Sequence, residues 1–506
     1  MARRLLFGTA SSAVSRIASL GTVFFLTPFL LRALGTEAYG LVMLLNVLTF
    51  NGYGSLADLG IASAVVKYTA EYRAQGAHEL LRRLLDTSFA LYWAISVAGG
   101  VLVLAVGWPL VDHVFRIAPA LVPLAHTLLL VLAVTTTADF ASAWCSAVLE
   151  GHQQFSVANG VQLGRTLVGA ALTVLLVSMG RGALGWLEAT AITSLLVVAT
   201  LVYLVARLTV WRPGRLRLDR ETLRRVAAFS ARIFSLRITG VMYNNVDRTV
   251  LGVMLPTSSL AVYDVANKVH TVGLMPMGFT SSLVVPAASG LQGAGRDADL
   301  RELFLRGTLY TVALSLPVTV LLFATAPEFL RVWLGPDFVR YAFEVRLFLS
   351  YLVFWVLPQV GWNMLVGLGQ ASALLRINVL SVTVNVVCSV LLARSWGIAG
   401  VIAGTVIGNL LATPLYLRLA FGRFGSGPAE FARRVLLRSY PQAAVAGLAV
   451  WGLIHAAPPH GVAPLLLYLA LGMGVFGALF WRGVDDVDRA RLRRALGRPW
   501  AAASPS

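Results

Sequence analysis

The sequence predicts an all-α polytopic membrane protein with about fourteen transmembrane helices. Of its 506 residues, 58% are hydrophobic and only 13% are charged, and the mean hydropathy is +0.76. These values lie well outside the range of soluble globular domains. Apolar runs of roughly 20 residues, enough for a helix to cross a bilayer, recur from one end of the chain to the other. The distribution of Lys and Arg between the intervening loops is the third observation behind this prediction.

The predicted spans follow one another so closely that no stretch remains for a soluble domain of useful size. The first apolar run is too long for a cleaved signal peptide and continues directly into the next element, so we expect it to be a span. The eighth span is the least regular, because prolines and glycines interrupt it. The spans are expected near residues 8–31, 41–63, 87–107, 121–146, 157–179, 184–206, 226–253, 260–288, 307–326, 343–367, 373–393, 397–417, 438–456 and 463–481.

Positive charge predicts the orientation in the membrane. The net charge is +18. The two terminal segments and every second loop together carry 28 of the 41 Lys and Arg residues, whereas the loops between them carry six. By the positive-inside rule, both termini are expected in the cytoplasm and the protein in the inner membrane. The basic loops have no aromatic residues interleaved for base stacking, which argues against a nucleic-acid partner.

Motifs for catalysis are absent from the sequence. It contains no Walker-type glycine loop, no HExxH or other metal-ligand spacing, and no carboxylate pair or nucleophile set in a polar domain. Its two cysteines, Cys145 and Cys388, lie in predicted spans without a CxxC pattern. We therefore predict a transporter with no catalytic residues, no cofactor and no metal site, rather than an enzyme.

An internal repeat supports transport, because many transporters are built from two similar halves. A shift of 216 residues places SRIASL at 15–20 on ARIFSL at 231–236, so that Arg16 meets Arg232. The same shift places Arg32 on Arg248. The predicted organisation is an N-terminal six-helix bundle at 1–206, a basic cytoplasmic linker at 207–225, a second six-helix bundle at 226–421, two additional helices at 422–482 and a cytoplasmic tail at 483–506.

Seven basic residues fall inside predicted spans, where an unpaired cation costs at least about 3 kcal/mol on the mildest scales. Such residues usually line a polar cavity, and a cavity lined mainly by arginine indicates an anionic substrate. They are Arg16, Arg165, Arg232, Arg237, Arg248, Lys268 and Arg346.

Three segments resemble bacterial polysaccharide flippases. LRALGTEAYGLVMLLNVLTFNGYGSLADLGIASAVVKYTAEY at 31–72 is similar to the start of that family, with its Leu-Gly, Tyr-Gly and Asp-Leu-Gly elements. NNVDRTVLGVMLPTSSLAVYDVANKV at 244–269 resembles the matching series in the second half, and SWGIAGVIAGTVIGN at 395–409 resembles the turn between the eleventh and twelfth spans.

The resemblance implies membership of the multidrug/oligosaccharidyl-lipid/polysaccharide superfamily. It implies two pseudo-symmetric six-helix bundles around a central cavity, with two extra C-terminal helices here. It also implies a substrate, a polyprenyl-pyrophosphate-linked oligosaccharide moved to the outer leaflet, with membrane lipids, glycan polymerases and glycosyltransferases as candidate partners. A peptidoglycan-precursor flippase and a multidrug exporter of the same superfamily are alternatives.

The candidate substrate-binding residues follow from depth and helical spacing. Arg165 and Arg237 lie near the midpoints of their spans, whereas Arg16 and Arg232 lie closer to cytoplasmic ends, where long side chains can reach water. Arg237, Asn244 and Arg248 fall within roughly 40° of one another on a helix. Guanidinium groups suit phosphate because they stay charged and donate in a planar fork.

Each of these arginines could instead belong to a structural ion pair. Asp247 lies beside Arg248 in the chain and could neutralise it or Arg237, and Asp264 could pair with Lys268 four residues later. The same two carboxylates are candidates for ion coupling, because a buried carboxylate can bind a proton or a sodium ion. The residues leave both alternatives open.

Overall fold

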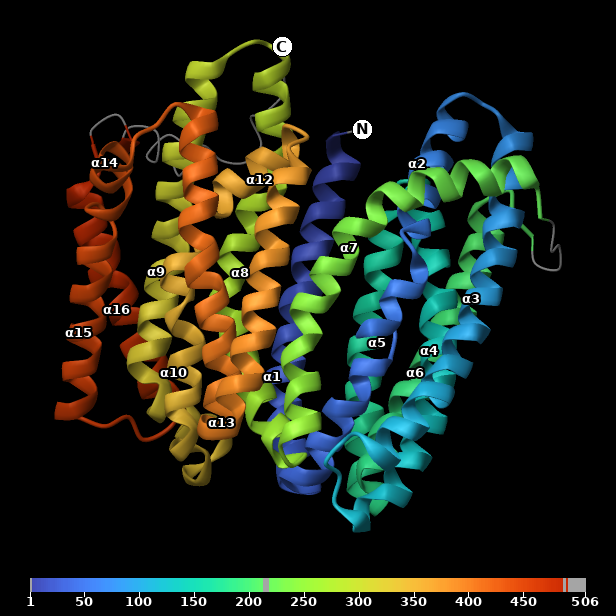
Figure 1. Ribbon diagram of the computed structural model, residues 1–506, viewed down its shortest axis with the longest axis horizontal. Helices are drawn as coiled ribbons and strands as arrows, with labels where there is room; N and C mark the ends of the chain where they lie inside the picture. The colour runs from blue at the N-terminus through green and yellow to red at the C-terminus, as the bar shows by residue number, and fades with distance from the viewer. Residues whose placement is uncertain (1, 213–217, 486–487, 490–506) are drawn as a thin grey trace. The chain divides into compact units, whose positions relative to one another are not determined.

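The computed structural model describes residues 2–212, 218–485 and 488–489, except for the side chains of 2–17, 20, 232–233, 235–237, 239, 279–283 and 371. Within these residues every regular element is a helix, which confirms the all-α class. The chain divides into two compact units, Met1–Asp264 and Val265–Ser506, whose helices are labelled in Figure 1. The five-segment organisation predicted from the sequence stays a prediction, and the tail at 490–506 lies outside the described residues.

In the first unit, α3 packs along α4, α4 along α6, and α5 along both α6 and α1. One of its cores includes Trp144 and Trp211, both fully buried, with ring centroids 5.0 Å apart. The first turns of α7 lie across one end of the unit, and the helix then runs along it (Figure 1). The helices are α1 (Ala2–Leu45), α2 (Ile61–Ala74), α3 (His78–His113), α4 (Val122–Gly151), α5 (Phe155–Leu176), α6 (Gly182–Leu208) and α7 (Arg220–Met254).

The segment between α1 and α2 differs from the continuous span predicted at 41–63. It consists of two 3₁₀ turns, Asn46–Leu48 and Tyr53–Asp58, followed by left-handed backbone at Leu59 and Gly60. Gly52 and Gly54 permit a tight turn here, because a Cβ at either position would collide with the backbone of Val47 or Thr49. The predicted span is therefore a broken one.

Two acidic side chains accept hydrogen bonds from backbone N–H groups at the starts of helices in this unit. Oδ1 of buried Asp58 accepts a hydrogen bond from the backbone N–H of Ala62 in α2 at 3.1 Å. Asp219 caps α7, because its carboxylate accepts from the hydroxyl of Thr222 at 2.6 Å and from the Thr222 backbone N–H at 2.8 Å. These two bonds hold the pKa of the Asp219 carboxyl below its ordinary value.

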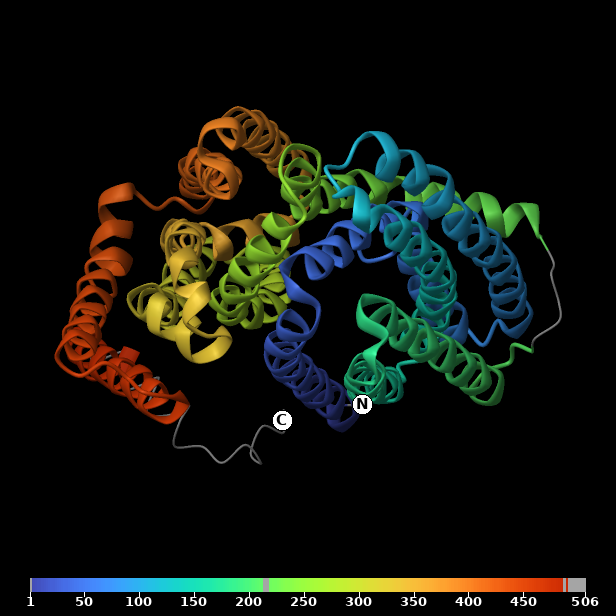
Figure 2. The same cartoon turned by 90° about the horizontal axis from the view of Figure 1, so that it is seen from below.

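In the second unit, α15 and α16 stand beside each other at one edge and pack against α9, as Figure 2 shows from the end. Helix α8 spans the boundary between the units and contains Pro276 and Pro286. The helices are α8 (Ser258–Gly293), α9 (Asp297–Leu334), α10 (Ala342–Ser350), α11 (Leu352–Trp355), α12 (Gln359–Gly367), α13 (Ala371–Phe424), α14 (Pro428–Phe431), α15 (Tyr440–Ala456) and α16 (Val462–Gly483).

Helix α13 is a hairpin of two arms, because its backbone leaves the helical region at Gly397, where φ is +56°. The arms approach closely through small residues. A Cβ at Gly404 would lie 2.2 Å from Oγ of Ser389, and the Ser389 hydroxyl donates to the carbonyl of Val401 on the opposite arm at 3.0 Å. Small residues and interhelical hydrogen bonds of this kind hold helices together in lipid, where the hydrophobic effect between helices is lost.

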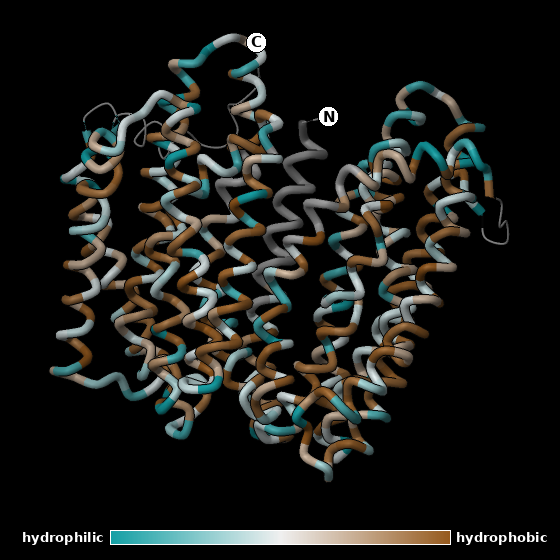
Figure 3. Tube along the Cα trace, in the orientation of Figure 1, coloured by the Kyte–Doolittle hydropathy of each residue, from teal (hydrophilic) through white to brown (hydrophobic). Residues whose placement is uncertain are grey.

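Helix lengths and hydropathy support a multi-pass membrane protein. Among the described residues, seven stretches are long and apolar enough to cross a membrane, or eight if Pro336–Trp355 and Gln359–Gly367, bent by 55°, form one broken span. Two stretches, Phe155–Leu208 and Ser372–Phe424, have 54 and 53 residues, more than twice the roughly 20 that one crossing needs. Figure 3 shows apolar residues along the helix middles and polar residues gathered near the ends. The total of fourteen spans stays a prediction.

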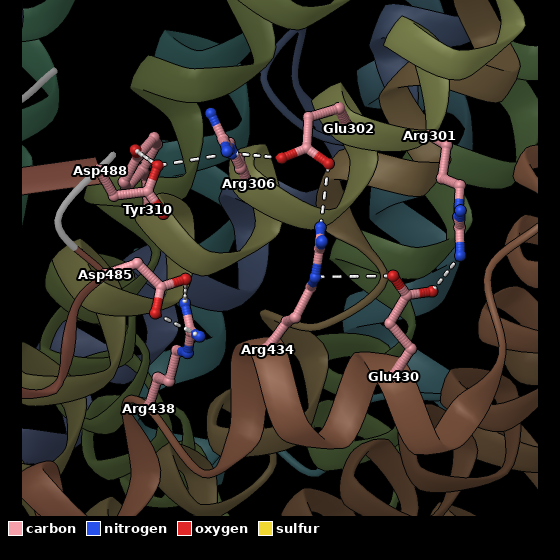
Figure 4. A network of polar contacts seen from close by, with 9 residues as sticks. All are labelled: Arg301, Glu302, Arg306, Tyr310, Glu430, Arg434, Arg438, Asp485 and Asp488. Atoms are coloured by element: carbon pink, nitrogen blue, oxygen red, sulfur yellow. Dashed lines mark hydrogen bonds and ion pairs between the residues drawn. The ribbon is translucent and has the colours of Figure 1, made fainter.

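Charged side chains connect the segments that flank α15 and α16 to α9 at one end of the second unit (Figure 4). Arg434 lies 2.9 Å from Glu302 of α9 and 3.5 Å from Glu430 of α14. Arg438 and Asp485 form a bidentate pair, with N–O distances of 2.7 and 2.8 Å, between the segment before α15 and the segment after α16. We call these residues, together with Arg301, Arg306, Tyr310 and Asp488, the ionic clasp.

The Arg438–Asp485 pair is expected to add measurably to stability, because its geometry is bidentate and Arg438 is only 22% exposed, with Asp485 59% exposed. A double-mutant cycle with Arg438→Ala and Asp485→Ala, read by thermal unfolding in detergent, should give a coupling energy of about 0.5–1 kcal/mol. The same cycle at Arg296 and Asp299, which are 61% and 46% exposed, serves as the matched control. Equal coupling in both cycles would contradict a role for the clasp.

Candidate substrate-binding site

A buried ion pair joins α4 to α5 inside the first unit. Nη2 of Arg165 lies 2.7 Å from Oδ1 of Asp139. Ser194 of α6 donates its hydroxyl to the same carboxylate oxygen at 2.9 Å and accepts a hydrogen bond from Arg165 Nη2 at 3.1 Å. One carboxylate and one hydroxyl from neighbouring helices thus hold the guanidinium. We call these three residues the arginine triad.

The triad leaves part of the guanidinium available. Both contacts of Arg165 use Nη2, and no other hydrogen bond of its side chain occurs within the described part of the chain. Since a guanidinium has five N–H donors, about three remain, on Nε and Nη1. Arg165 is 24% exposed, whereas Asp139 is only 4% exposed. Asp139 and Ser194 therefore hold the Arg165 guanidinium in place, while its remaining N–H groups can still bind an anion.

Helix α1 approaches α5 next to this arginine. Oγ of Ser19 in α1 lies 3.2 Å from Oγ1 of Thr166, the residue after Arg165. Ser19 follows Arg16 by three residues, about one helical turn. The Arg16 side chain itself lies outside the described residues, as do those of Arg232 and Arg237. Their proposed roles stay predictions.

A second polar group lies where α1, α7 and the start of α8 meet. Nη2 of Arg248 lies 3.6 Å from Oδ1 of Asp264, and the Tyr39 hydroxyl donates to Oδ2 of Asp264 at 2.7 Å. Nearby in sequence, the Tyr263 hydroxyl donates to Oδ2 of Asp247 at 2.9 Å. Both carboxylates are buried. Each is thus held by a tyrosine donor, which reduces the cost of burying its charge.

These contacts refine the pairing expected from the sequence. Arg248 has Asp264 as its carboxylate partner in the described part of the chain, not the adjacent Asp247. The pair of Asp264 with Lys268 stays a prediction. Asn244 is exposed, and its amide nitrogen donates to the carbonyl of Gly240 in its own helix at 2.8 Å. Substrate binding by Asn244 also stays a prediction.

Sequence reasoning missed the side chains that hydrogen-bond these charged groups, namely Ser194, Tyr39 and Tyr263. Serine and tyrosine are common in membrane spans, so their presence alone carried no signal. Ser194 and Asp139 are separated by 55 residues, and Tyr39 and Asp264 by 225. Only the packing of α4 against α6 and of α1 near α8 brings them together. The sequence places Asp139 inside the predicted span 121–146, but it does not indicate that Asp139 pairs with Arg165.

Comparison with known proteins decides the family. Residues 29–342 match the family described as polysaccharide biosynthesis protein, which is more than half of the chain. The chain belongs to that family. This confirms the resemblance to polysaccharide flippases inferred from the three sequence segments.

Two relatives of this polysaccharide biosynthesis protein support the assignment. The uncharacterized membrane protein EpsK of Bacillus subtilis is 24% identical over 402 residues, covering 78% of this chain and 79% of EpsK. The probable low-salt glycan biosynthesis flippase Agl15 of Haloferax volcanii is 20% identical over 179 residues, covering 35% of this chain and 38% of Agl15.

The fold has a solved counterpart in the lipid II flippase MurJ in an inward closed conformation. The TM-score is 0.71 at 14% sequence identity, covering 98% of this chain and all of MurJ. At this identity the similarity concerns the fold alone. The family match and this fold together describe a multi-pass membrane protein of the polysaccharide biosynthesis family that has the helical fold of a solved flippase. By their names, EpsK is a membrane protein, and Agl15 and MurJ are flippases.

Proposed function

We propose that this protein moves a polyprenyl-pyrophosphate-linked oligosaccharide across the cytoplasmic membrane by alternating access, for export of a cell-surface polysaccharide. Both termini lie in the cytoplasm in this proposal, and the protein works alongside glycan polymerases and glycosyltransferases. The observation that carries it is the arginine triad. Arg165 is a cation inside a membrane unit, braced on Nη2 by Asp139 and Ser194 and with about three N–H donors left over.

The chemistry of such a substrate suits this arrangement. Its pyrophosphate carries concentrated negative charge, its glycan needs water, and its polyprenyl tail can remain in lipid. A guanidinium held in one orientation offers two parallel N–H donors to a phosphate, and it remains charged at any physiological pH. In the proposal Arg165 and Arg237 make the principal phosphate contacts. Arg16, Arg232, Arg248 and Asn244 form a second tier along the path of the headgroup.

Asp247 and Asp264 are the proposed sites of any ion coupling. Both are buried, and each accepts a hydrogen bond from a tyrosine hydroxyl. A carboxylate in this setting can exchange its partner for a proton or a sodium ion when the surrounding helices move. Charge compensation of Arg248 by Asp264 is the competing role for that carboxylate, and the 3.6 Å contact between them supports it.

A peptidoglycan-precursor flippase is the second candidate function, because that substrate also carries a pyrophosphate and the fold resembles MurJ. The family match to polysaccharide biosynthesis proteins favours the oligosaccharide. Multidrug export is a weaker alternative, since a cationic drug would be repelled by an excess of arginine.

The decisive experiment follows labelled polyprenyl-pyrophosphate sugars across the bilayer of liposomes that contain the purified protein. Wild-type protein should accelerate their movement, and Arg165→Ala and Arg237→Ala should each reduce the rate at least tenfold, the effect of losing about 1.4 kcal/mol of phosphate binding. Arg346→Ala is the matched control, because it removes a span arginine outside the proposed site. Wild-type rates in both site variants would refute the phosphate contact, and preference for a peptidoglycan precursor would select the second candidate.

A further inference from the structure

We infer that Asp139 determines how tightly Arg165 holds an anionic headgroup, by orienting the guanidinium and by offsetting part of its charge so that the headgroup can leave. Asp139 is then a positioning residue for the substrate, not a ligand of it. This inference rests on the proposed function, because it gives Asp139 a role at the same site.

Orientation follows from the hydrogen bonds of the triad. The carboxylate accepts at 2.7 Å from Nη2 of Arg165 and at 2.9 Å from the hydroxyl of Ser194, which in turn accepts from Nη2 at 3.1 Å. These contacts close a ring across three helices and engage only one nitrogen of the guanidinium. The side chain of a free arginine has many rotamers, and holding it in one of them removes an entropy cost at binding.

Charge compensation follows from the burial of Asp139. Its side chain is only 4% exposed, so water does little to screen its field at Arg165. An arginine without a nearby carboxylate would attract a pyrophosphate more strongly, but a transporter must also release its substrate on the other side of the membrane. Tighter binding to one state slows the steps that leave that state. A buried carboxylate beside the phosphate-binding cation lowers affinity and permits turnover.

Another acid–arginine pair of the first unit provides a comparison. Arg181 and Glu188 lie 2.6 Å apart around the turn that connects α5 to α6, and Arg181 is 52% exposed. Water screens this pair, and Glu188 is a full helical turn or more from Ser194 along α6. Glu188→Gln therefore removes an acid from a similar pair without touching the triad.

The test measures binding and transport separately in Asp139→Asn and Asp139→Ala, each purified as the full chain. Binding of a labelled polyprenyl-pyrophosphate sugar is measured in detergent, and transbilayer movement in liposomes. Asparagine keeps an oxygen that can accept from Arg165 and Ser194 but has no charge, so the dissociation constant should fall roughly tenfold while transport becomes slower. Alanine removes the brace as well, so it should bind less tightly than asparagine. Glu188→Gln should match the wild type in both measurements.

The outcomes distinguish failure of the role of Asp139 from failure of the proposed transport function. If Arg165→Ala impairs binding but Asp139→Asn leaves both affinity and rate unchanged, the role of Asp139 is refuted and the proposed function stands. If Asp139→Asn weakens binding as much as Asp139→Ala, the carboxylate does not act through its charge and the inference also fails. If the wild type neither binds nor moves the labelled lipid, the proposed function and the inference fail together. Ser194→Ala tests the orientation of the Arg165 guanidinium separately, because it removes one hydrogen-bond partner and retains the charge of Asp139. It should weaken binding of the labelled lipid.

Discussion

Replacing Arg165 with methionine is expected to lower the free energy of unfolding by about 3 kcal/mol, because it leaves the carboxylate of Asp139 buried without its cation. The distance of 2.7 Å and the 4% exposure of Asp139 place this pair among buried ion pairs rather than surface ones. We expect the lower end of the usual range, since Arg165 itself is 24% exposed. Thermal and denaturant unfolding in detergent measure the change.

The double variant Arg165→Met/Asp139→Leu should recover most of that stability, because two apolar side chains of similar size can replace a buried pair at little cost. It should still fail to transport, since no cation remains at this position. This variant distinguishes loss of transport through lost substrate binding from loss of transport through lost stability. Loss of transport in a stable double variant assigns the loss to the missing cation, whereas transport at the wild-type rate would show that Arg165 serves the fold alone.

The class of the protein was readable from the sequence because it depends on properties averaged over many residues. Hydropathy, the alternation of basic loops and the three flippase-like segments all extend over long stretches. An error at one residue or one span boundary therefore does not change the predicted class. The family match at 29–342 confirms the result.

Local interruptions and side-chain partners could be predicted less well. The span expected at 41–63 is interrupted at a tight turn, where Gly52 and Gly54 lie directly against the backbone of Val47 and Thr49, and hydropathy does not register such a turn. Partners such as Asp139 and Ser194 for Arg165 depend on which helices pack together. Helical spacing predicts neighbours on one helix, but it carries no information about the facing helix.

Alanine at Asp264 is expected to be the second most damaging change, with a loss of about 2 kcal/mol in the free energy of unfolding. The substitution removes the carboxylate partner of Arg248 and the acceptor for the hydroxyl of Tyr39, which is fully buried. Asp264→Asn should cost less than half as much, because its amide oxygen can still accept from Tyr39. Tyr39→Phe should cost about 1 kcal/mol.

A surface pair provides the control for this series. Glu221 and Arg225 lie 2.5 Å apart at the exposed start of α7, with 73% and 49% exposure, so Glu221→Ala should change stability by less than about 0.5 kcal/mol. Equal losses for Asp264→Ala and Glu221→Ala would contradict the assignment of a buried structural pair. The asparagine variant then separates the two roles proposed for Asp264. If it keeps near-native stability but transport no longer responds to a proton or sodium gradient, the carboxylate serves coupling. If stability and transport fall together, its function is to neutralise Arg248.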